Sequence, residues 1–515
     1  MRYFPLFESA GVRRGVRRNV SVVATGFFCF LGLVVLGLAS LKPSVGAFAQ
    51  EYKQATVDES LASQKSTVLA SSDEAQVKDF LRKYYLARWT VIDNEREIHK
   101  YRAELEADAT SVSGAPQATF LKATVDALKS YAASSECYPA CRFNAVYAIG
   151  TLNEVAGADR NSPGVPYAGA ISTLANFCTS SKEFPDYVRL GALLGLVRHA
   201  ELGIKDDKNR AGVKTVFARI LDAKYKEEKN LRDDVYEWFQ EVAMQGLASF
   251  KSPEGSKGGV GALDLFRQII EDSERSFELR CVAARAIGSM DLTSAQNYDY
   301  VGLGKSLVTL ARDFCIEEST YIDTEIVRDQ VKNAAGSAMG GGMGGMSGGA
   351  TGGMTGGGMM GGGMMGGASG GMGGMTGGGM GGGTIQNQKS LEAMVARVQY
   401  GFDCIQCAVK GSTKGLGIME KLSDSDQAQK DMKDTLKNLL DEFKSTNEFI
   451  EEGPKYSSGM SGMTGGMAGG SGGMYGGASG GKGKSVVIMV DASSMKDHLL
   501  EKKIKFSEML GINAY

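Results

Sequence analysis

Four segments of this chain share one pattern, and the spacing between them limits the folds that the chain can adopt. Each segment opens with a large residue and continues through small and aliphatic residues, and three of the four have glycine at the ninth position. The segments are Arg142-FNAVYAI-Gly150, Arg189-LGALLGL-Val197, Trp238-FQEVAMQ-Gly246 and Arg280-CVAARAI-Gly288. Their starts are separated by 47, 49 and 42 residues, a spacing typical of repeated helix pairs.

An apolar stripe precedes each of these segments, and a fifth stripe follows the last of them. The stripes recur at three- and four-residue steps, which places each of them on one face of a helix. They begin at Phe120, Tyr167, Val213, Leu263 and Leu303. One helix pair cannot bury such a face alone, so neighbouring pairs must stack into a continuous core. The sequence therefore predicts an all-α fold, an α-solenoid of stacked helix pairs.

The chain resembles the HEAT/armadillo class of α-solenoids over roughly residues 117–335. The segments CRFNAVYAIGTL (141–152) and LRCVAARAIGSM (279–290) are similar to the second helix of a HEAT repeat. MVARVQYGFDCIQCAV (394–409) looks like another second helix, so the resemblance extends over about 385–450. It implies that small residues of the second helices pack on the next unit. It also implies a curved scaffold that binds other macromolecules, and it transfers no catalytic residue.

The N-terminus has the pattern of an export signal. An arginine-rich segment precedes an uncharged stretch of 22 residues, Val20 to Leu41, and an A-x-A site ends at Ala49. This pattern is typical of a secretory signal that is cleaved after Ala49. The stretch is also long enough to span a bilayer as an uncleaved anchor. In both cases the arginines stay in the cytoplasm, and the body is exported to a bacterial-type periplasm or cell envelope, anchored or secreted.

Two tracts consist mostly of glycine and methionine. Residues 336–383 contain 28 Gly and 11 Met, and a second tract covers about 457–484. Neither tract has the periodicity of a helix or strand, and glycine has the highest entropy cost of ordering, so both are predicted to be disordered. Methionine sulfur suits Cu(I), which leaves soft-metal binding by these tracts as an alternative function. Adaptable contact with apolar surfaces is a further alternative to a plain linker.

Two pairs of cysteines stand close together in the sequence. Cys137 and Cys141 flank a proline at an expected helix start, where a disulfide could form. Cys404 and Cys407 have the spacing of a redox or metal motif. They lie within a helical pattern, and no second pair supplies the four ligands of a zinc site. We therefore interpret both pairs as structural, either buried thiols or local disulfides, and the redox or metal role stays the alternative for the second pair.

The remaining segments complete the predicted organisation. A capping box of Ser71 and Glu74 opens a single helix over 74–108. Near the C-terminus, residues 478–485 fit a loose phosphate-loop pattern, but a strand follows where the mechanism needs a helix, so no nucleotide site is predicted. The predicted segments are a signal or anchor (1–49), a helical extension (50–113), helical repeats (114–335), a disordered insertion (336–384), further helices (385–452), a linker (453–484) and a strand–helix unit (485–515).

Charge and composition exclude several functions. The first 49 residues contain six Lys and Arg residues and one Glu, so the remainder carries 51 basic and 58 acidic residues. This mild acidity argues against nucleic acid as a partner. The chain has three histidines, which lie far apart in the sequence. We expect no catalytic, cofactor-binding or metal-binding residue, no cofactor, and membrane contact only through the N-terminal segment. The predicted function is an exported scaffold that binds an unknown protein and is not an enzyme.

Overall fold

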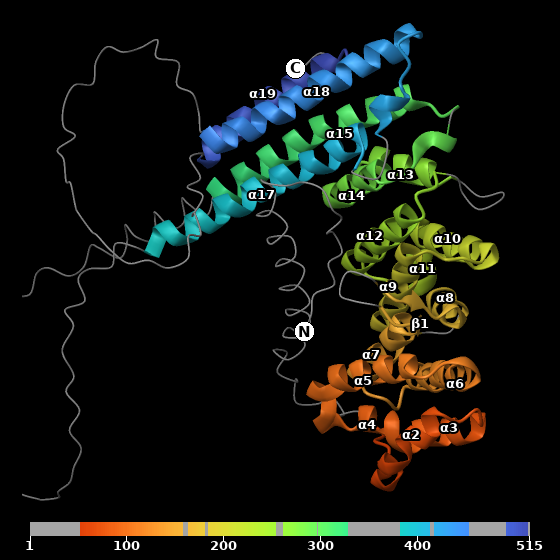
Figure 1. Cartoon of the computed structure of the whole chain (residues 1–515). Coiled ribbons are helices and arrows are strands. Elements are labelled where there is room, and N and C mark those ends of the chain that lie inside the picture. The colour runs from red at the N-terminus through yellow and green to blue at the C-terminus, as the bar shows by residue number, and fades with distance from the viewer. Residues whose placement is uncertain are drawn as a thin grey trace, which may run out of the picture.

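The fold is predominantly helical, as predicted (Figure 1). The computed structural model describes residues 52–157, 163–180, 184–253, 261–295, 297–327, 382–412, 417–452 and 491–512. Within these residues the strands form a single antiparallel pair, β1 (Asn153–Val155) and β2 (Val165–Pro166), which the sequence analysis did not predict. The N-terminal segment, most of the two Gly/Met tracts and all but the last residue of the predicted strand at 485–491 lie outside the described residues.

The predicted helix pairs form a row of helices. The first helices are α6 (Gly114–Ala133), α8 (Ile171–Thr179), α10 (Asp207–Leu221), α13 (Ala262–Glu271) and α15 (Tyr300–Tyr321). The second helices are α7 (Pro139–Thr151), α9 (Asp186–Leu202), α12 (Asp233–Ser249), α14 (Phe277–Gly288) and α17 (Gly382–Lys410). Each second helix packs against the next one along the chain. We call these ten helices the helix row; they rise in chain order in Figure 1, second helices on one side.

Glycines let the second helices approach one another closely. A Cβ atom added at Gly150 on α7 would lie 2.5 Å from the Cα atom of Gly195 on α9. A Cβ atom at Gly288 on α14 would clash with the backbone of Cys407 on α17. Gly246 instead accommodates the ring of Phe217, which belongs to α10 of its own pair. Small residues of the second helices therefore pack on the next unit at two of these three positions.

Buried side chains join the two helices of a pair. The arginine that opens a sequence segment lies in the first turns of the second helix and donates to a carbonyl oxygen at the end of the preceding first helix. Arg142 Nε donates to the Ala132 oxygen at 3.1 Å, and Arg280 Nε to the Ile270 oxygen at 2.8 Å. In α12, Gln240 has this role, because its Nε2 donates to the Leu221 oxygen at 3.4 Å. The carbonyl groups that a helix end leaves unpaired are satisfied in this way.

The single helix predicted over 74–108 is wrong. The chain forms α3 (Glu74–Phe80), the π-helical η2 (Leu81–Tyr85), α4 (Ala87–Thr90), the 3-10 helix η3 (Ile92–Glu97) and α5 (Ile98–Ser111). The break falls at Val91, which is extended with ψ of 116°. The Thr90 hydroxyl donates to the Ala87 oxygen and accepts from the Ala55 backbone, both at 2.8 Å. The capping box is also wrong, since Asp73 caps α3 through the backbone N–H groups of Ala75 and Gln76.

The break brings α5 back toward the start of the chain. Apolar residues on both sides of it are buried in one core, among them Leu81, Ile98 and Leu105. The preceding residues form η1 (Glu59–Gln64) and α2 (Lys65–Leu69). The helical segments before and after Val91 thus share one core instead of continuing as a single straight helix. We call residues 52–111 the N-terminal region.

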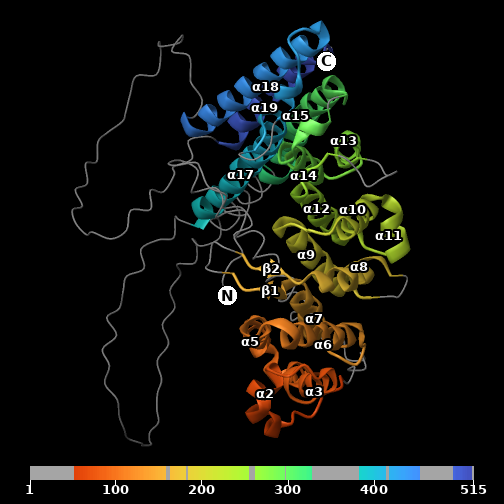
Figure 2. The same ribbon diagram turned by 45° about the vertical axis from the view of Figure 1, so that its right-hand side comes forward.

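A bundle of long helices stands at the other end of the row. The helices α18 (Gln427–Glu452) and α19 (Ala492–Met509) both pack against α15, and α17 packs against α15 and α18. The aromatic rings of Phe402, Phe443 and Phe506 follow one another across this bundle, with centroids 4.4 and 6.0 Å apart. Figure 2 shows the long helices of this bundle lying at an angle to the column of helices below them.

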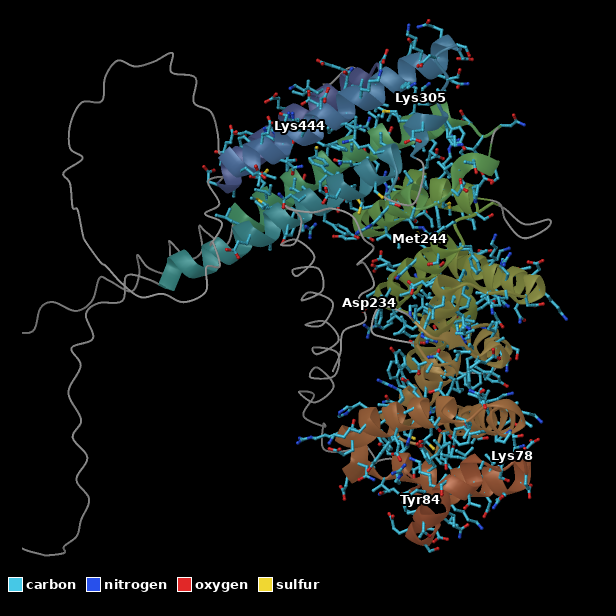
Figure 3. The ribbon with its side chains drawn as sticks, viewed as in Figure 1. Lys78, Tyr84, Asp234, Met244, Lys305 and Lys444 are labelled. Carbon is cyan, nitrogen blue, oxygen red and sulfur yellow. The ribbon has the colours of Figure 1, made fainter. Side chains whose placement is uncertain are left out.

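Short elements connect the long helices. They are η4 (Ala168–Ala170), α11 (Ala223–Lys229), η5 (Leu292–Ser294), the π-helical η6 (Ile322–Val327) and η7 (Ile418–Lys421). Met244 on α12 is fully buried in the row, whereas Asp234 is exposed at the start of the same helix (Figure 3). The predicted repeats thus share one continuous core with α17, which begins at Gly382, within the segment predicted to be disordered.

Candidate functional site

A line of linked polar side chains begins at α5 and α7. Arg102 Nη1 on α5 donates to Asn144 Oδ1 on α7 at 3.0 Å, and its guanidinium lies 4.7 Å from the ring centre of Tyr147. Glu106 Oε1 accepts a hydrogen bond from the Thr151 hydroxyl at 2.6 Å. The α5 helix therefore contacts the first of the second helices through charged side chains that are half-buried.

Arg198 continues the line on α9. Its Nη1 donates to the Gly150 oxygen at 3.0 Å, and its Nη2 donates to Asn153 Oδ1 at 2.6 Å. Burial lowers the pKa of Arg198, while the charge of Glu106 opposes this effect. One turn further, Glu201 Oε1 accepts from Gln245 Nε2 on α12 at 3.0 Å. These contacts join three successive second helices through their side chains.

The line reaches α14 and α17 at its far end. Arg285 on α14 is hydrogen-bonded to Tyr400 on α17, and the charge of Glu241 on α12 acts on the same tyrosine. Desolvation raises the pKa of Glu241 and of Asp403, although both side chains remain exposed, and the Arg285 charge opposes it at Asp403. Each carboxylate is therefore less well solvated than one on a flat surface.

Helical spacing explains why these residues lie on one surface. On α7, α9, α12 and α17 they recur at steps of three or four residues, which share a helix face, and α14 contributes Arg285 alone. We call the set the polar ladder, and it comprises Arg102, Glu106, Asn144, Tyr147, Leu194, Arg198, Glu201, Trp238, Glu241, Gln245, Arg285, Tyr400 and Asp403. None of them is fully buried. The sequence analysis did not nominate them, although the i, i+3, i+7 recurrence of Trp238, Glu241 and Gln245 was a readable signal.

The ladder combines the side chains that dominate binding energy at protein interfaces. Tyrosine, tryptophan and arginine are enriched among interface residues whose truncation costs the most affinity. The ladder offers Tyr147, Trp238 and Tyr400 beside three arginines, across six helices. Its acidic members with raised pKa values, Glu201 among them, are stabilised by any cation that approaches. This arrangement suits an extended partner that carries basic and aromatic groups.

No protein-family model, curated protein or solved structure matches this chain. In the described part of the chain, no group of three or more His, Cys, Asp and Glu side chains could hold a metal ion. Over the same residues, no helix is both long and apolar enough to cross a membrane. The candidate anchor at 20–41 lies outside them. The function must therefore be argued from the ladder and from the sequence.

A second group of charges lines a cavity in the row. The cavity has a volume of about 450 Å³ and lies between α13, α14 and α15. Arg267 pairs there with Glu271 at 2.7 Å, and Arg280 pairs with Asp313 at 3.2 Å. Because these charges already neutralise one another, the cavity is a weaker candidate for ligand binding than the ladder.

The four cysteines of the two predicted pairs are free thiols in this structure. Cys404 is fully buried, and burial raises its pKa to about 12. Cys407 is partly buried, burial raises its pKa, and its thiol donates to the Arg285 oxygen at 3.8 Å. A redox or metal-binding thiol needs the opposite shift, toward the thiolate. The structural interpretation of the second pair therefore fits its surroundings.

Several sequence motifs lie wholly or partly outside the described residues. The phosphate-loop pattern at 478–485 and almost all of the Gly/Met tracts belong to this group, so the structure describes no site in them. Asp491, the last residue of the predicted strand, is described and is not in a strand. It caps α19, since Oδ1 accepts from the Ser494 backbone at 2.8 Å and Oδ2 from its hydroxyl at 2.9 Å.

Proposed function

We propose that this chain is an exported, non-catalytic scaffold whose polar ladder binds another protein. The carrying observation is that hydrogen bonds of the ladder join α5, α7, α9 and α12, and that a further contact joins α14 to α17, where the charge of Glu241 on α12 also acts. The sequential packing of the second helices supports an α-solenoid of the HEAT/armadillo kind. Such a row offers an extended surface whose length exceeds that of any single helix. An elongated, weakly acidic surface of this kind suits a protein partner with basic side chains.

Site-specific photo-crosslinking tests this function. A photoreactive phenylalanine analogue replaces Glu241 on α12 or Asp403 on α17, both of which are exposed. The matched control carries the same analogue at Lys208, an exposed residue of α10 on a first helix. We expect both ladder positions to capture the same protein in the producing cells, and the control to capture none of it. Equal capture from the control position, or only self-crosslinks, contradicts the proposal.

Charge reversal separates the ladder from nonspecific adhesion. The variants Glu241→Lys and Asp403→Lys place a cation where the proposal requires an anion, and we expect each to weaken capture at least about tenfold. The variant Asp207→Lys on α10 is the control, because it makes the same charge change on an exposed first-helix residue. Unchanged capture by the ladder variants would count against the ladder.

Export is tested on the unmodified chain. Cell fractionation followed by N-terminal sequencing is expected to place the protein in the envelope or medium. A mature start at Gln50 indicates a cleaved signal, and retention of Met1 in a membrane fraction indicates an anchor. Recovery of the intact chain from the cytosol contradicts export. Soft-metal binding by the Met tracts stays the alternative, and Cu(I) titration against a variant without these methionines tests it.

A further inference from the structure

A second site stands apart from the ladder, where the N-terminal region meets α6 and α7. A cleft of about 260 Å³ opens there, lined by Lys53, Thr90, Tyr131, Ser134, Glu136 and Cys137, among others. The backbone of Lys53 closes one side by donating to the Glu136 oxygen at 2.9 Å. The cleft is therefore a built feature of the fold, and a thiol forms part of its wall.

A second thiol lies directly behind the first. Cys137 precedes α7, and Cys141 lies in the first turn of that helix, with the proline at N1 between them. The Cys141 thiol donates a hydrogen bond to Cys137, and the Ser134 hydroxyl donates another. Cys141 is fully buried, so only Cys137 meets the cleft. The two sulfur atoms thus occupy different positions, one outer and one inner.

The surroundings favour the thiolate at the outer position. The hydrogen bond from Cys141 lowers the pKa of Cys137, and burial opposes this effect. The hydrogen bond from Ser134 and the charge of Arg142 lower it further, so that the pKa is about 7. The hydrogen bond to Cys137 and burial raise the pKa of Cys141 well above its usual range. The N-terminus of α7 adds a positive dipole end beside the outer sulfur. This asymmetry is absent from Cys404 and Cys407, whose pKa values are both raised.

We propose that Cys137 and Cys141 form a thiol–disulfide exchange site that takes a small disulfide through this cleft. The Cys137 thiolate attacks one sulfur of the disulfide RSSR, the S–S bond breaks, and one RS⁻ leaves. Cys141 then releases its proton to solvent, and its sulfur attacks Cys137. The mixed disulfide breaks and the second RS⁻ leaves. The two cysteines are oxidised by two electrons to one disulfide, and RSSR is reduced to two thiols.

The inner position of Cys141 explains the second step. While Cys137 is a thiolate, it accepts a hydrogen bond from the Cys141 thiol, which keeps the inner thiol protonated. Once Cys137 carries a mixed disulfide, that charge is lost and the inner thiol is free to ionise. The two steps therefore follow in one order, with Cys137 as the attacking thiol and Cys141 as the resolving thiol.

The test uses the full-length chain and the chromogenic disulfide dithiobis(nitrobenzoate). We expect the pair to release two equivalents of nitrothiobenzoate and to retain no aryl adduct. Peptide mass mapping should then find Cys137 joined to Cys141. Reaction at Cys137 should be at least about tenfold faster at pH 7 than at Cys407, the internal control, and its rate should level off above about pH 8.

Two variants separate the steps. Cys141→Ser should release one equivalent from this site and retain the aryl group on Cys137, because no thiol remains to displace it. Cys137→Ser should lose the fast phase. Thermal unfolding of each variant verifies that it is folded. A stable aryl adduct on Cys137 in the unaltered chain, or a fast phase that survives Cys137→Ser, would overturn the proposal.

Discussion

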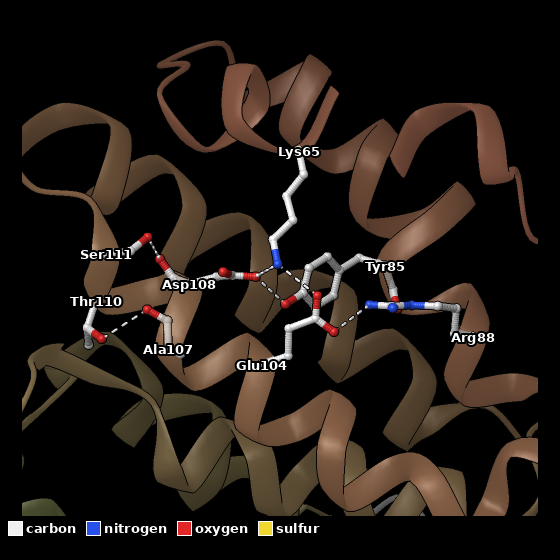
Figure 4. A network of polar contacts seen from close by, with 8 residues as sticks. All are labelled: Lys65, Tyr85, Arg88, Glu104, Ala107, Asp108, Thr110 and Ser111. Carbon is white, nitrogen blue, oxygen red and sulfur yellow. Dashed lines mark hydrogen bonds and ion pairs between the residues drawn. The ribbon is translucent and has the colours of Figure 1, made fainter. Parts of the chain in front are cut away.

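The helix row and the N-terminal region are both built from short helices, but their helices meet in different ways. In the row, α7 and α9 touch backbone to backbone at Gly150 and Gly195. In the N-terminal region, α2 meets α5 through Lys65, whose Nζ lies 2.7 Å from both Glu104 and Asp108 (Figure 4). A contact between glycines needs only small residues, so it can recur from one helix pair to the next. The Lys65 network needs particular charged partners, so it joins the N-terminal region at one place. The row can therefore extend by repetition, and the N-terminal region forms its end.

The polar groups of the two regions also differ in exposure. Three arginines of the row, Arg142, Arg189 and Arg280, are buried and donate to carbonyl groups, as Arg189 Nη1 does to Phe177 and Cys178 at 3.4 Å each. In the N-terminal region, the side chains of Lys65 and Glu104 keep about a third of their surface exposed, at 30% and 34%. Removing a buried donor costs more than removing a half-exposed ion pair. Substitutions should therefore affect the row more strongly.

The largest effect is expected for Arg189→Met in the row. The substitution leaves the buried carbonyl groups of Phe177 and Cys178 without this donor, at a cost of about 4 kcal/mol in the free energy of unfolding. The control is Arg219→Met, which removes a half-exposed ion pair with Glu228 on the row's surface. Denaturant unfolding measures both. A loss for Arg189→Met no larger than that of the control would show that the pair-joining arginines are dispensable.

The second prediction concerns pH. Burial and, next, the charge of Arg198 lower the pKa of His199 to about 4 from its ordinary value of 6.5. Below pH 6.5 the histidine is therefore protonated in the unfolded chain but stays neutral in the folded row. The free energy of unfolding keeps its full value above pH 6.5 and falls by about 3 kcal/mol as the pH drops to 4. His199→Leu should remove this loss, as measured by urea unfolding at several pH values.

The same measurement separates the two regions. Partial burial opposes the change, but the hydrogen bond from Lys65 and the charge of Arg88 lower the pKa of Glu104 from 4.5. Its contribution is therefore present above pH 4.5 and lost below it. Glu104→Gln should flatten the stability profile only below pH 4.5, whereas His199→Leu flattens it between 6.5 and 4. Coincident windows for the two variants would contradict this assignment.

A smaller effect than that of Arg189→Met is expected for Lys65→Met. The variant removes the cation between Glu104 and Asp108, and we expect a loss of about 1–2 kcal/mol because the site is partly solvated. Asp108 keeps its hydrogen bond from Tyr85, which limits the loss. The control is Lys83→Met, an exposed pair with Asp79 within the same region, which should leave stability unchanged. Thermal unfolding compares the two, and equal midpoints would show that the network has no structural role.

The row was predictable because its signals are local and repeated. Apolar stripes and the positions of Gly150, Gly246 and Gly288 can be read at fixed spacing, and the helices stand where that spacing puts them. The sequence does not show which residue of α12 joins the pair, and the structure gives this role to Gln240.

The N-terminal region was not predictable in the same way. The apolar stripe from Val77 to Leu105 keeps a helical spacing although Arg88, Glu95 and Arg102 interrupt it, and no glycine or proline marks the break at Val91. The break depends on Thr90 contacting Ala55, which lies 35 residues earlier. The polar ladder was missed for a related reason. Its members look like an ordinary solvated helix face until neighbouring helices bring Arg198, Glu201 and Gln245 together.

A comparison of two Gly→Ala substitutions tests the close packing of the second helices most directly. Gly150→Ala places a methyl group against the backbone of Gly195, while Gly212→Ala on α10 places one in open space. Both changes remove the same backbone entropy from the unfolded chain, so only the helix contact differs. We predict a loss of about 1–3 kcal/mol in the free energy of unfolding for Gly150→Ala and a gain of about 0.5–1 kcal/mol for Gly212→Ala. Stabilisation by both variants would show that α7 and α9 do not meet at these glycines.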